Sequence, residues 1–273
     1  MFIDSHCHLE DASLNKDIEL IIESSNKAGV NKFISIHMLG SGSEIKVFRN
    51  QLDNFSGIYG SIGKHPDCIL ESKDIVKEEE LYKLSCGKKI VAIGETGFDF
   101  YRTALSDRSS VYELQKANFE THIKVASELG LPLILHSRDS DTEMIDFLTL
   151  MKGRYTFDFI LHCFCGGEAL KEMVLDLGGY IGLGGIITFG NRKVKREREL
   201  LLEEDIRSIP IERICLETDS PYLSPHPNRG KRNDPSSIPI IAKSLSIIHS
   251  KSLKEVEEIT TRNTEKLFKK LLD

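Results

Sequence analysis

Two histidines near the start of the chain carry the clearest chemical signal in the sequence. His6 and His8 lie two positions apart in the segment FIDSHCH at residues 2–8. In an extended strand alternate side chains share one face, so both imidazoles, together with Asp4, would point the same way and hold one metal ion. Histidines at this spacing also occur as hydrogen-bonded core residues, and the rest of the chain must distinguish the two interpretations.

Histidines and acidic residues recur at the ends of later apolar runs. They are His65, Glu95, His136, His162 and Asp219. Imidazole and carboxylate together are ligands of Zn²⁺ and Mn²⁺, and a site with enough carboxylates also accepts Mg²⁺. The recurrence favours a metal site over a purely structural role for the first two histidines.

The elements that would position these residues alternate along the chain. Segments of helical period lie between short apolar runs; Ile18, Ile21 and Ile22, for example, share one helix face within residues 17–28. Further helices are predicted at residues 113–129, 237–250 and 253–272. The β-rich runs predict eight strands, at residues 2–5, 32–37, 58–62, 90–94, 131–135, 157–161, 179–183 and 213–217.

This alternation predicts the fold. Eight strand and helix units indicate an α/β protein, a single (β/α)8 TIM barrel over residues 1–273 with its metal site at the C-terminal ends of the strands. An open doubly wound sheet is the alternative, and the absence of a glycine-rich dinucleotide motif after the first strand disfavours it. A composition of 40% hydrophobic and 29% charged residues indicates a globular chain with a sizeable core.

Barrel closure assigns the ligands, because strand eight then neighbours strand one, and strands four to six neighbour each other. We predict two divalent ions, Mg²⁺, Mn²⁺ or Zn²⁺, with six ligands: His6, His8 and Asp219 for the first ion, His136 and His162 for the second, and Glu95 as the bridge. Such a pair activates water and stabilises the oxygens of a displacement at phosphorus. Glu95 and Asp219 are the predicted catalytic carboxylates, with Asp219 as a general base for the water.

Basic residues in the loops after strands seven and eight are candidates for phosphate binding, since these loops form the usual phosphate site of this barrel. The later loop carries Arg229, Lys231 and Arg232, and a guanidinium can bind phosphate with paired hydrogen bonds. The earlier loop also carries a basic cluster, and at its end acidic and basic residues alternate. We interpret this earlier cluster as a solvated helix face. That cluster comprises Arg192, Lys193, Lys195 and Arg196.

Other residues at the predicted barrel mouth are further candidates for substrate contacts. We include Lys64, His65, Arg138 and Tyr222 among them. Lys64 would act as a Schiff-base lysine only if it were desolvated, whereas His65 suits phosphate. The aromatic residues of these loops could either stack on bases or pack at the barrel mouth, and both roles stay open. These aromatics are Tyr101, Phe164 and Tyr222.

Charge and composition limit the partners and the compartment. The formal net charge of -6 creates no overall positive field, so nucleic acid would need a local basic patch or bound metal. The six cysteines form no Cys-x-x-Cys pair, as expected of reduced intracellular thiols. We expect no signal peptide, transmembrane segment or membrane partner, and therefore a cytoplasmic or nuclear protein. A monomer is favoured.

Seven short motifs carry a family resemblance. They are FIDSHCH at 2–8, GKHP at 63–66, GETGFDFY at 94–101, HSRD at 136–139, HCF at 162–164, ETDSPYL at 217–223 and RGKR at 229–232. In these motifs the whole chain resembles the TatD family of metal-dependent deoxyribonucleases. The resemblance implies a TIM barrel with the same six ligands. It also implies a hydrolase that trims single-stranded DNA ends from the 3′ side, with links to DNA repair or degradation.

The sequence departs from the family pattern at two positions near the site. Asp67 stands where the family often has a histidine, and Cys165 stands where a serine is usual. Three alternative functions are a small-amide or ester hydrolase of the wider amidohydrolase type, a hydrolase of aminoacyl-tRNA esters, and a catalytically silent nucleic-acid-binding barrel. Glu95 disfavours the first, because many binuclear amidohydrolases carry a modified lysine after strand four.

Overall fold

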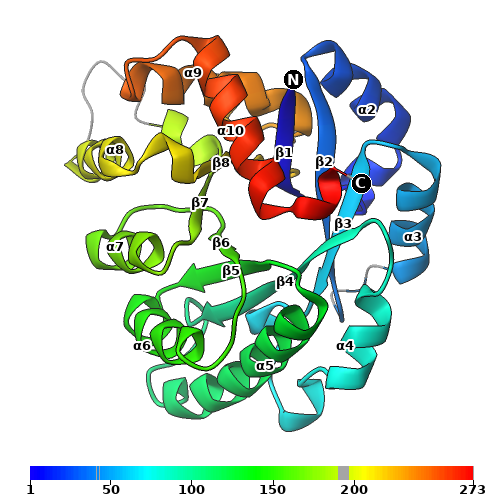
Figure 1. Ribbon diagram of the computed structural model, residues 1–273, viewed down its shortest axis with the longest axis vertical. Coiled ribbons are helices and arrows are strands. Elements are labelled where there is room, and N and C mark those ends of the chain that lie inside the picture. Colours follow the sequence, from blue (N-terminus) through cyan, green and yellow to red (C-terminus); the bar gives the residue numbers. More distant parts are fainter. Residues whose placement is uncertain (41, 43, 190–196, 273) are drawn as a thin grey trace.

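The computed structural model describes residues 1–40, 42, 44–189 and 197–272. Eight parallel strands form one sheet in the order β1 to β8, so consecutive strands are neighbours. The sheet curves round on itself, and helices surround it (Figure 1). The strands are β1 (Phe2–Cys7), β2 (Val30–Met38), β3 (Ile58–Gly63), β4 (Ile90–Asp99), β5 (Leu133–Arg138), β6 (Phe159–Leu161), β7 (Tyr180–Leu183) and β8 (Ile214–Leu216).

Contacts between the first strand and the segment after the last strand close the barrel. Cys7 forms a parallel bridge with Ser220. The backbone N–H of Asp219 donates to the carbonyl of His6 at 2.9 Å, and that of His8 donates to the carbonyl of Ser220 at 2.8 Å. The predicted TIM barrel is confirmed, and the doubly wound alternative is wrong, because an open sheet would leave both edge strands unpaired.

The four helices predicted at residues 17–28, 113–129, 237–250 and 253–272 are present, with differences at their ends. The predicted segment 113–129 begins earlier, at Arg108, and the predicted segment 253–272 ends at Leu267, where the chain leaves the helix at Phe268. The α-helices are α1 (Ala12–Asn15), α2 (Ile18–Lys27), α3 (Ile45–Asn54), α4 (Glu78–Ser85), α5 (Arg108–Leu129), α6 (Asp141–Lys152), α7 (Glu168–Asp176), α8 (Glu197–Ser208), α9 (Ile238–Ile248) and α10 (Leu253–Leu267).

Strand β4 is longer than the predicted segment 90–94. It continues to Asp99 because Thr96 and Gly97 pair with Leu135 and His136 of β5. All residues of β4 are buried. The extension therefore brings Glu95 and the residues after it into the barrel instead of into a surface loop.

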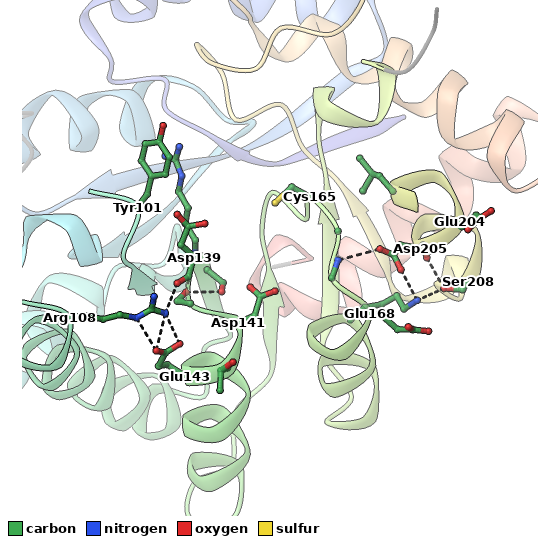
Figure 2. Close-up of a pocket in the computed structure, with 18 residues that line it drawn as sticks. Tyr101, Arg108, Asp139, Asp141, Glu143, Cys165, Glu168, Glu204, Asp205 and Ser208 are labelled. Carbon is green, nitrogen blue, oxygen red and sulfur yellow. Dashed lines mark hydrogen bonds and ion pairs between the residues drawn. The ribbon is translucent and has the colours of Figure 1, made fainter. Parts of the chain in front are cut away.

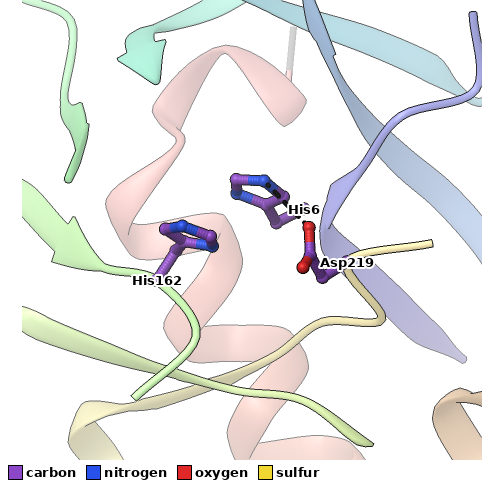
Figure 3. Close-up of side chains that lie close together, drawn as sticks. All are labelled: His6, His162 and Asp219. Carbon is purple, nitrogen blue, oxygen red and sulfur yellow. Dashed lines mark ion pairs between the residues drawn. The ribbon is translucent and has the colours of Figure 1, made fainter. Parts of the chain in front are cut away.

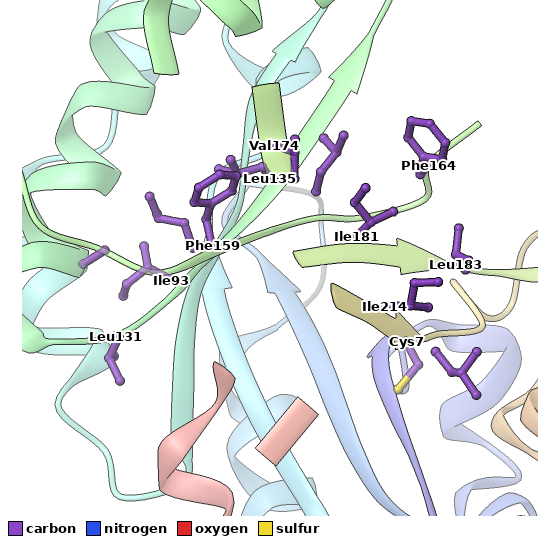
Figure 4. Close-up of a cluster of buried hydrophobic side chains, with 14 of the residues drawn as sticks. Cys7, Ile93, Leu131, Leu135, Phe159, Phe164, Val174, Ile181, Leu183 and Ile214 are labelled. Atoms are coloured by element: carbon purple, nitrogen blue, oxygen red, sulfur yellow. The ribbon is translucent and has the colours of Figure 1, made fainter. Parts of the chain in front are cut away.

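The hydrophobic core has two parts. The larger part packs the strands against the helices, and Figure 4 shows it around Phe159, Ile181 and Ile214. A second cluster joins Ile34 and other strand residues to Phe268, which follows α10. The C-terminal segment therefore packs against residues of the strands. Within the described part of the chain, no helix has both the length and the hydropathy needed to cross a membrane.

Candidate metal centre

Residues from five strands converge at one end of the barrel. His6 and Glu95 lie within β1 and β4, and His136 lies within β5. His162 follows β6 directly, and Asp219 lies in the turn after β8. Parallel strands in a barrel end at the same rim, so residues that are far apart in sequence meet there. Figure 3 shows His6, His162 and Asp219 facing one another.

The first group of predicted ligands lies around Asp219. Its Oδ1 atom lies 3.2 Å from Nε2 of His8 and 3.7 Å from Nε2 of His6. The same Nε2 atom of His6 lies 3.5 Å from Oε2 of Glu95. The structure therefore brings together the three residues predicted for the first ion, with Glu95 beside them.

The second group gathers around the other oxygen of Glu95. Its Oε1 atom lies 2.7 Å from Nε2 of His162 and 2.8 Å from Nδ1 of His136. Those two ring nitrogens are 3.2 Å apart. Glu95 thus lies between the two groups, with one carboxylate oxygen toward each.

The chemistry of this cluster suits divalent ions. Both ring nitrogens of His6 are buried and have no hydrogen-bond partner, although buried polar groups in proteins are normally paired. The ring of His6 also stacks on that of His162 at 4.0 Å. Ligand atoms of His6, His8 and Glu95 lie within 4.8 Å of one another, and so do those of Glu95, His136 and His162. Imidazole and carboxylate in this arrangement match zinc-type and manganese-type sites.

Electrostatics keep the two acids ionised. Burial raises the pKa of Glu95, but His162, His65 and His136 outweigh it and hold that pKa well below its usual value. Burial also raises the pKa of Asp219. The hydrogen bond from His8 and the charge of His6 outweigh this effect, and the pKa lies below its usual value. Two ionised carboxylates among imidazoles form a site that attracts cations.

His65 lies at the edge of the cluster. Its Nε2 atom is 3.4 Å from Oε1 of Glu95, and its Nδ1 atom is 2.5 Å from Oδ1 of Asp67. Burial lowers the pKa of His65, but the charge of Glu95 and the contact with Asp67 raise it overall to about 10. Asp67, where the family often has histidine, therefore supports a cationic His65.

Two carboxylates at the centre were not among the predicted site residues. Asp99 lies 3.0 Å from Nε2 of His136, and Glu217 lies 3.7 Å from Nδ1 of His162. Asp99 stands in the GETGFDFY motif and Glu217 in the ETDSPYL motif, so the motifs contained a signal for both. Asp4, which the strand pattern places with the histidines, instead accepts hydrogen bonds from the N–H and hydroxyl of Thr218.

The predicted substrate residues lie at varying distances from the cluster. Tyr222 is 54% exposed, and its ring lies 6.0 Å from that of His8. Lys64 points toward Asp74, with 4.0 Å between the charged atoms. The buried side chain of Phe164 belongs to the hydrophobic core, which favours the packing role for this residue.

The predicted arginines are engaged in other contacts. Arg138 stacks over the ring of Tyr101 at 3.6 Å. Arg229 stacks over Phe189 at 3.4 Å. Arg232 pairs with Asp17 at 2.6 Å. Lys231 is exposed in the same loop. The basic cluster at residues 192–196 lies outside the described residues.

A cavity of about 1030 Å³ opens where the loops after β5 and β6 meet α8. Figure 2 shows Tyr101 at one side of it and many acidic side chains around it. Arg108 pairs with Glu143, and Lys171 pairs with Asp205. The third basic side chain in the lining is Arg138, which stacks on Tyr101. The remaining acids disfavour a phosphate chain in this cavity. They include Asp139, Asp141, Glu168 and Glu204.

A TIM barrel with a buried cluster of histidines and carboxylates at its mouth defines the class of metal-dependent hydrolases. The model of the TatD-related DNase family matches residues 3–269. The chain therefore belongs to the TatD-related DNase family, as its motifs imply.

Relatives along the whole chain agree with this assignment. The uncharacterized metal-dependent hydrolase YabD of Bacillus subtilis is 31% identical over 98% of this chain and 99% of its own. An uncharacterized metal-dependent hydrolase of Buchnera aphidicola is 37% identical over 97% of this chain and 98% of its own. The crystal structure of the TatD homologue YjjV of Escherichia coli has a TM-score of 0.80 and 25% identity, and covers 98% of both chains.

Proposed function

We propose that this chain is a divalent-metal-dependent deoxyribonuclease that removes nucleotides from the 3′ ends of single-stranded DNA. One observation carries the proposal. The carboxylate of Glu95 lies between two groups of ligands, with Oε2 toward His6 and Oε1 toward His136 and His162. A bridging carboxylate of this kind suits two ions, and paired ions are typical of enzymes that cleave phosphodiesters.

The residues of the chain have distinct tasks in this reaction. When bound, two divalent ions, Mg²⁺, Mn²⁺ or Zn²⁺, would activate water and polarise the phosphodiester. His6, His8 and Asp219 would hold one ion, His136 and His162 the other, and Glu95 both. The lowered pKa of Asp219 keeps its carboxylate ionised, as a general base for the attacking water requires. A protonated His65, whose pKa is raised to about 10, can donate to a phosphate oxygen.

The surroundings of the cluster suggest how the strand is bound. Tyr222 is exposed beside His8 and offers a ring on which a terminal base can stack. Lys231 extends from the same loop and supplies positive charge for the backbone. The cavity beside Arg138 is acidic, so the strand would approach from the side of β8 and β1.

The test uses single-stranded DNA labelled at its 5′ end, with Mg²⁺, with Mn²⁺ and with a chelator. We expect a ladder of products shortened from the 3′ end that forms only with metal. Asp219→Asn keeps the shape of the side chain but removes its charge, and we expect activity to fall by at least about 100-fold. Asp146→Asn makes the same change on the exposed face of α6 and should be neutral.

Other outcomes would contradict the nuclease. Chelator-insensitive degradation, or full activity of Asp219→Asn, would exclude the metal mechanism. If the protein hydrolysed a small amide or an aminoacyl-tRNA ester with metal but did not cleave DNA, that compound would replace DNA as the proposed substrate. Binding of DNA without any turnover would identify a silent barrel.

We also propose that the chain acts as a monomer in the cytoplasm. All six cysteines are free thiols, which suits a reducing compartment. Light scattering after size-exclusion chromatography should give the mass of one chain, 30.8 kDa. A dimer mass would contradict the proposed oligomeric state without affecting the proposed chemistry.

A further inference from the structure

The histidines of the second group differ from those of the first in what lies behind them. The ring of His136 has Nδ1 toward Glu95, and its Nε2 atom lies 3.0 Å from Oδ2 of Asp99. The ring of His162 has Nε2 toward Glu95, and its Nδ1 atom faces Oε1 of Glu217 at 3.7 Å, which is longer than a hydrogen bond and leaves Nδ1 without a hydrogen-bond partner. Each ring therefore lies between Glu95 and an outer carboxylate.

Asp99 is itself held on two sides. Its Oδ1 atom accepts the backbone N–H of Tyr101 at 2.9 Å, and its own N–H donates to Oε1 of Gln115 at 3.0 Å. Only 8% of Asp99 is exposed. The remaining oxygen therefore faces His136 from a fixed position, as an acceptor for the Nε2 proton.

Glu217 is completely buried behind His162. Its Oε1 atom accepts the backbone N–H of Cys163 at 2.6 Å, and its Oε2 atom has no partner. Gly182 of β7 leaves room for it, because a Cβ atom there would lie 2.4 Å from Oε2. A buried carboxylate with an unpaired oxygen is costly to stability, which favours a functional reason for its position.

Among the described residues, no outer carboxylate faces Nδ1 of His6 or Nδ1 of His8, because the ion pairs of both rings use Nε2. Both ring nitrogens of His6 and the Nδ1 atom of His8 are buried without a hydrogen-bond partner. A metal-binding histidine whose other ring nitrogen donates to a carboxylate has a fixed tautomer and a fixed ring orientation. The two groups should therefore differ in how well they are prepared for an ion.

We propose that Asp99 and Glu217 are positioning residues that fix the tautomers of His136 and His162 and thereby set the affinity of the second metal position. The proposal rests on the two-metal site of the proposed function. Asp99 accepts the Nε2 proton of His136 at 3.0 Å, and the carboxylate of Glu217 favours a proton on Nδ1 of His162, 3.7 Å away. Each nitrogen that faces Glu95 can then give up its proton when an ion binds, while the proton on the other ring nitrogen stays in place.

The test titrates the metal-free protein with Mn²⁺ in a calorimeter. We expect two binding events in the native chain. Asp99→Asn and Glu217→Gln should each weaken one event by about 10–100-fold and leave the other unchanged. Glu10→Gln is the matched control, because Glu10 forms a buried pair with His37 at 2.7 Å outside the second group. Glu10→Gln should leave unchanged the affinity of the binding event that Asp99→Asn and Glu217→Gln weaken.

A second measurement separates positioning from simple loss of stability. The ring-nitrogen NMR shifts of the Zn²⁺-loaded protein should show His136 with its proton on Nε2. Asp99→Asn should abolish this preference while the backbone spectrum stays unchanged. If Glu217→Gln does not fold, Asp99→Asn decides the question.

Three outcomes would overturn the proposal. One is native affinity for both ions in Asp99→Asn and Glu217→Gln. Another is an equal loss of both binding events in each variant. A third is a further Mn²⁺ ion in the native chain that Asp99→Asn alone removes, because ligand atoms of His65, Asp99 and His136 also lie within 4.8 Å of one another. None of these measurements uses DNA, so failure of the nuclease assay would leave this result intact.

Discussion

Glu95 connects the two halves of the candidate centre. Its carboxylate oxygens face different histidines, so its charge offsets the repulsion that two neighbouring cations would experience. The neighbouring imidazoles hold the pKa of Glu95 well below its usual value, although burial alone would raise it.

Glu95→Gln tests this role. The substitution keeps the shape but removes the charge, so we expect the affinity for both ions to fall and the hydrolytic activity to decrease by at least about 100-fold. Metal content after gel filtration and the DNA assay measure the two effects. Retention of two tightly bound ions in Glu95→Gln would contradict a bridging carboxylate.

At the scale of elements, helix α5 supports the barrel mouth with a buried polar stripe. Gln115 donates to the carbonyl of Pro66 at 3.1 Å, and Asn118 donates to the carbonyl of Lys64 at 3.1 Å. His122 accepts the backbone N–H of Lys64 at 3.0 Å and contacts the carbonyl of Asn118 at 2.7 Å. The helix therefore fixes the loop that carries His65.

The buried His122 predicts a pH dependence of stability. Burial lowers its pKa to about 4 from the ordinary 6.5, although the hydrogen bond to Asn118 opposes this. Between these values the unfolded chain binds a proton that the folded chain does not. The free energy of unfolding should therefore fall as the pH falls, by about 1.4 kcal/mol per pH unit from this group.

His122→Gln provides the comparison, because glutamine offers an acceptor for Lys64 and a donor for Asn118 but does not titrate. Urea unfolding at a series of pH values between the two pKa values should show a shallower decrease for the variant, by about one proton. Equal slopes for both proteins would mean that His122 does not become protonated on unfolding in this range.

At the scale of the whole molecule, the C-terminal segment completes the core. Phe268 is fully buried in the cluster that contains Ile34. We expect Phe268→Ala to lower the free energy of unfolding by about 3–5 kcal/mol, because it removes a large buried ring. Leu272→Ala is the control, since Leu272 is 67% exposed and should change stability by less than about 0.5 kcal/mol. Chemical denaturation measures the free energy of unfolding of both variants. Similar losses in the two variants would contradict a role of Phe268 in the core.

The overall charge leads to a prediction about salt. A formal net charge of -6 gives no long-range attraction for DNA, so affinity must come from local contacts and bound ions. If Lys231 contacts a phosphate, Lys231→Ala should reduce the slope of log affinity against log salt by about 0.7 for a single strand. Lys243→Ala on the exposed face of α9 should leave the slope unchanged. Fluorescence anisotropy of labelled single-stranded DNA across a salt series measures this slope.

Much of this molecule was predictable because local patterns are strong in alternating strand and helix units. Strands and helices follow from side-chain periodicity, and the extension of β4 to Asp99 was missed because it depends on pairing with β5. The polar stripe of α5 was missed as well, since polar residues such as Gln115 are normally expected on the outer face of a helix.

The sequence by itself determined the barrel, the family and the residue types at the strand ends, because these depend on periodicity and on short motifs. The inferred barrel also predicted that His8 and Asp219 would lie together, but only the tertiary structure decided the atoms and the distances of their contact. His8 and Asp219 are 211 positions apart, so their 3.2 Å contact depends on closure of the barrel. Arg232 pairs with Asp17, and Glu217 lies behind His162. Both contacts likewise depend on how distant segments pack. Residue types carry no information about these distances, because long-range register sets them.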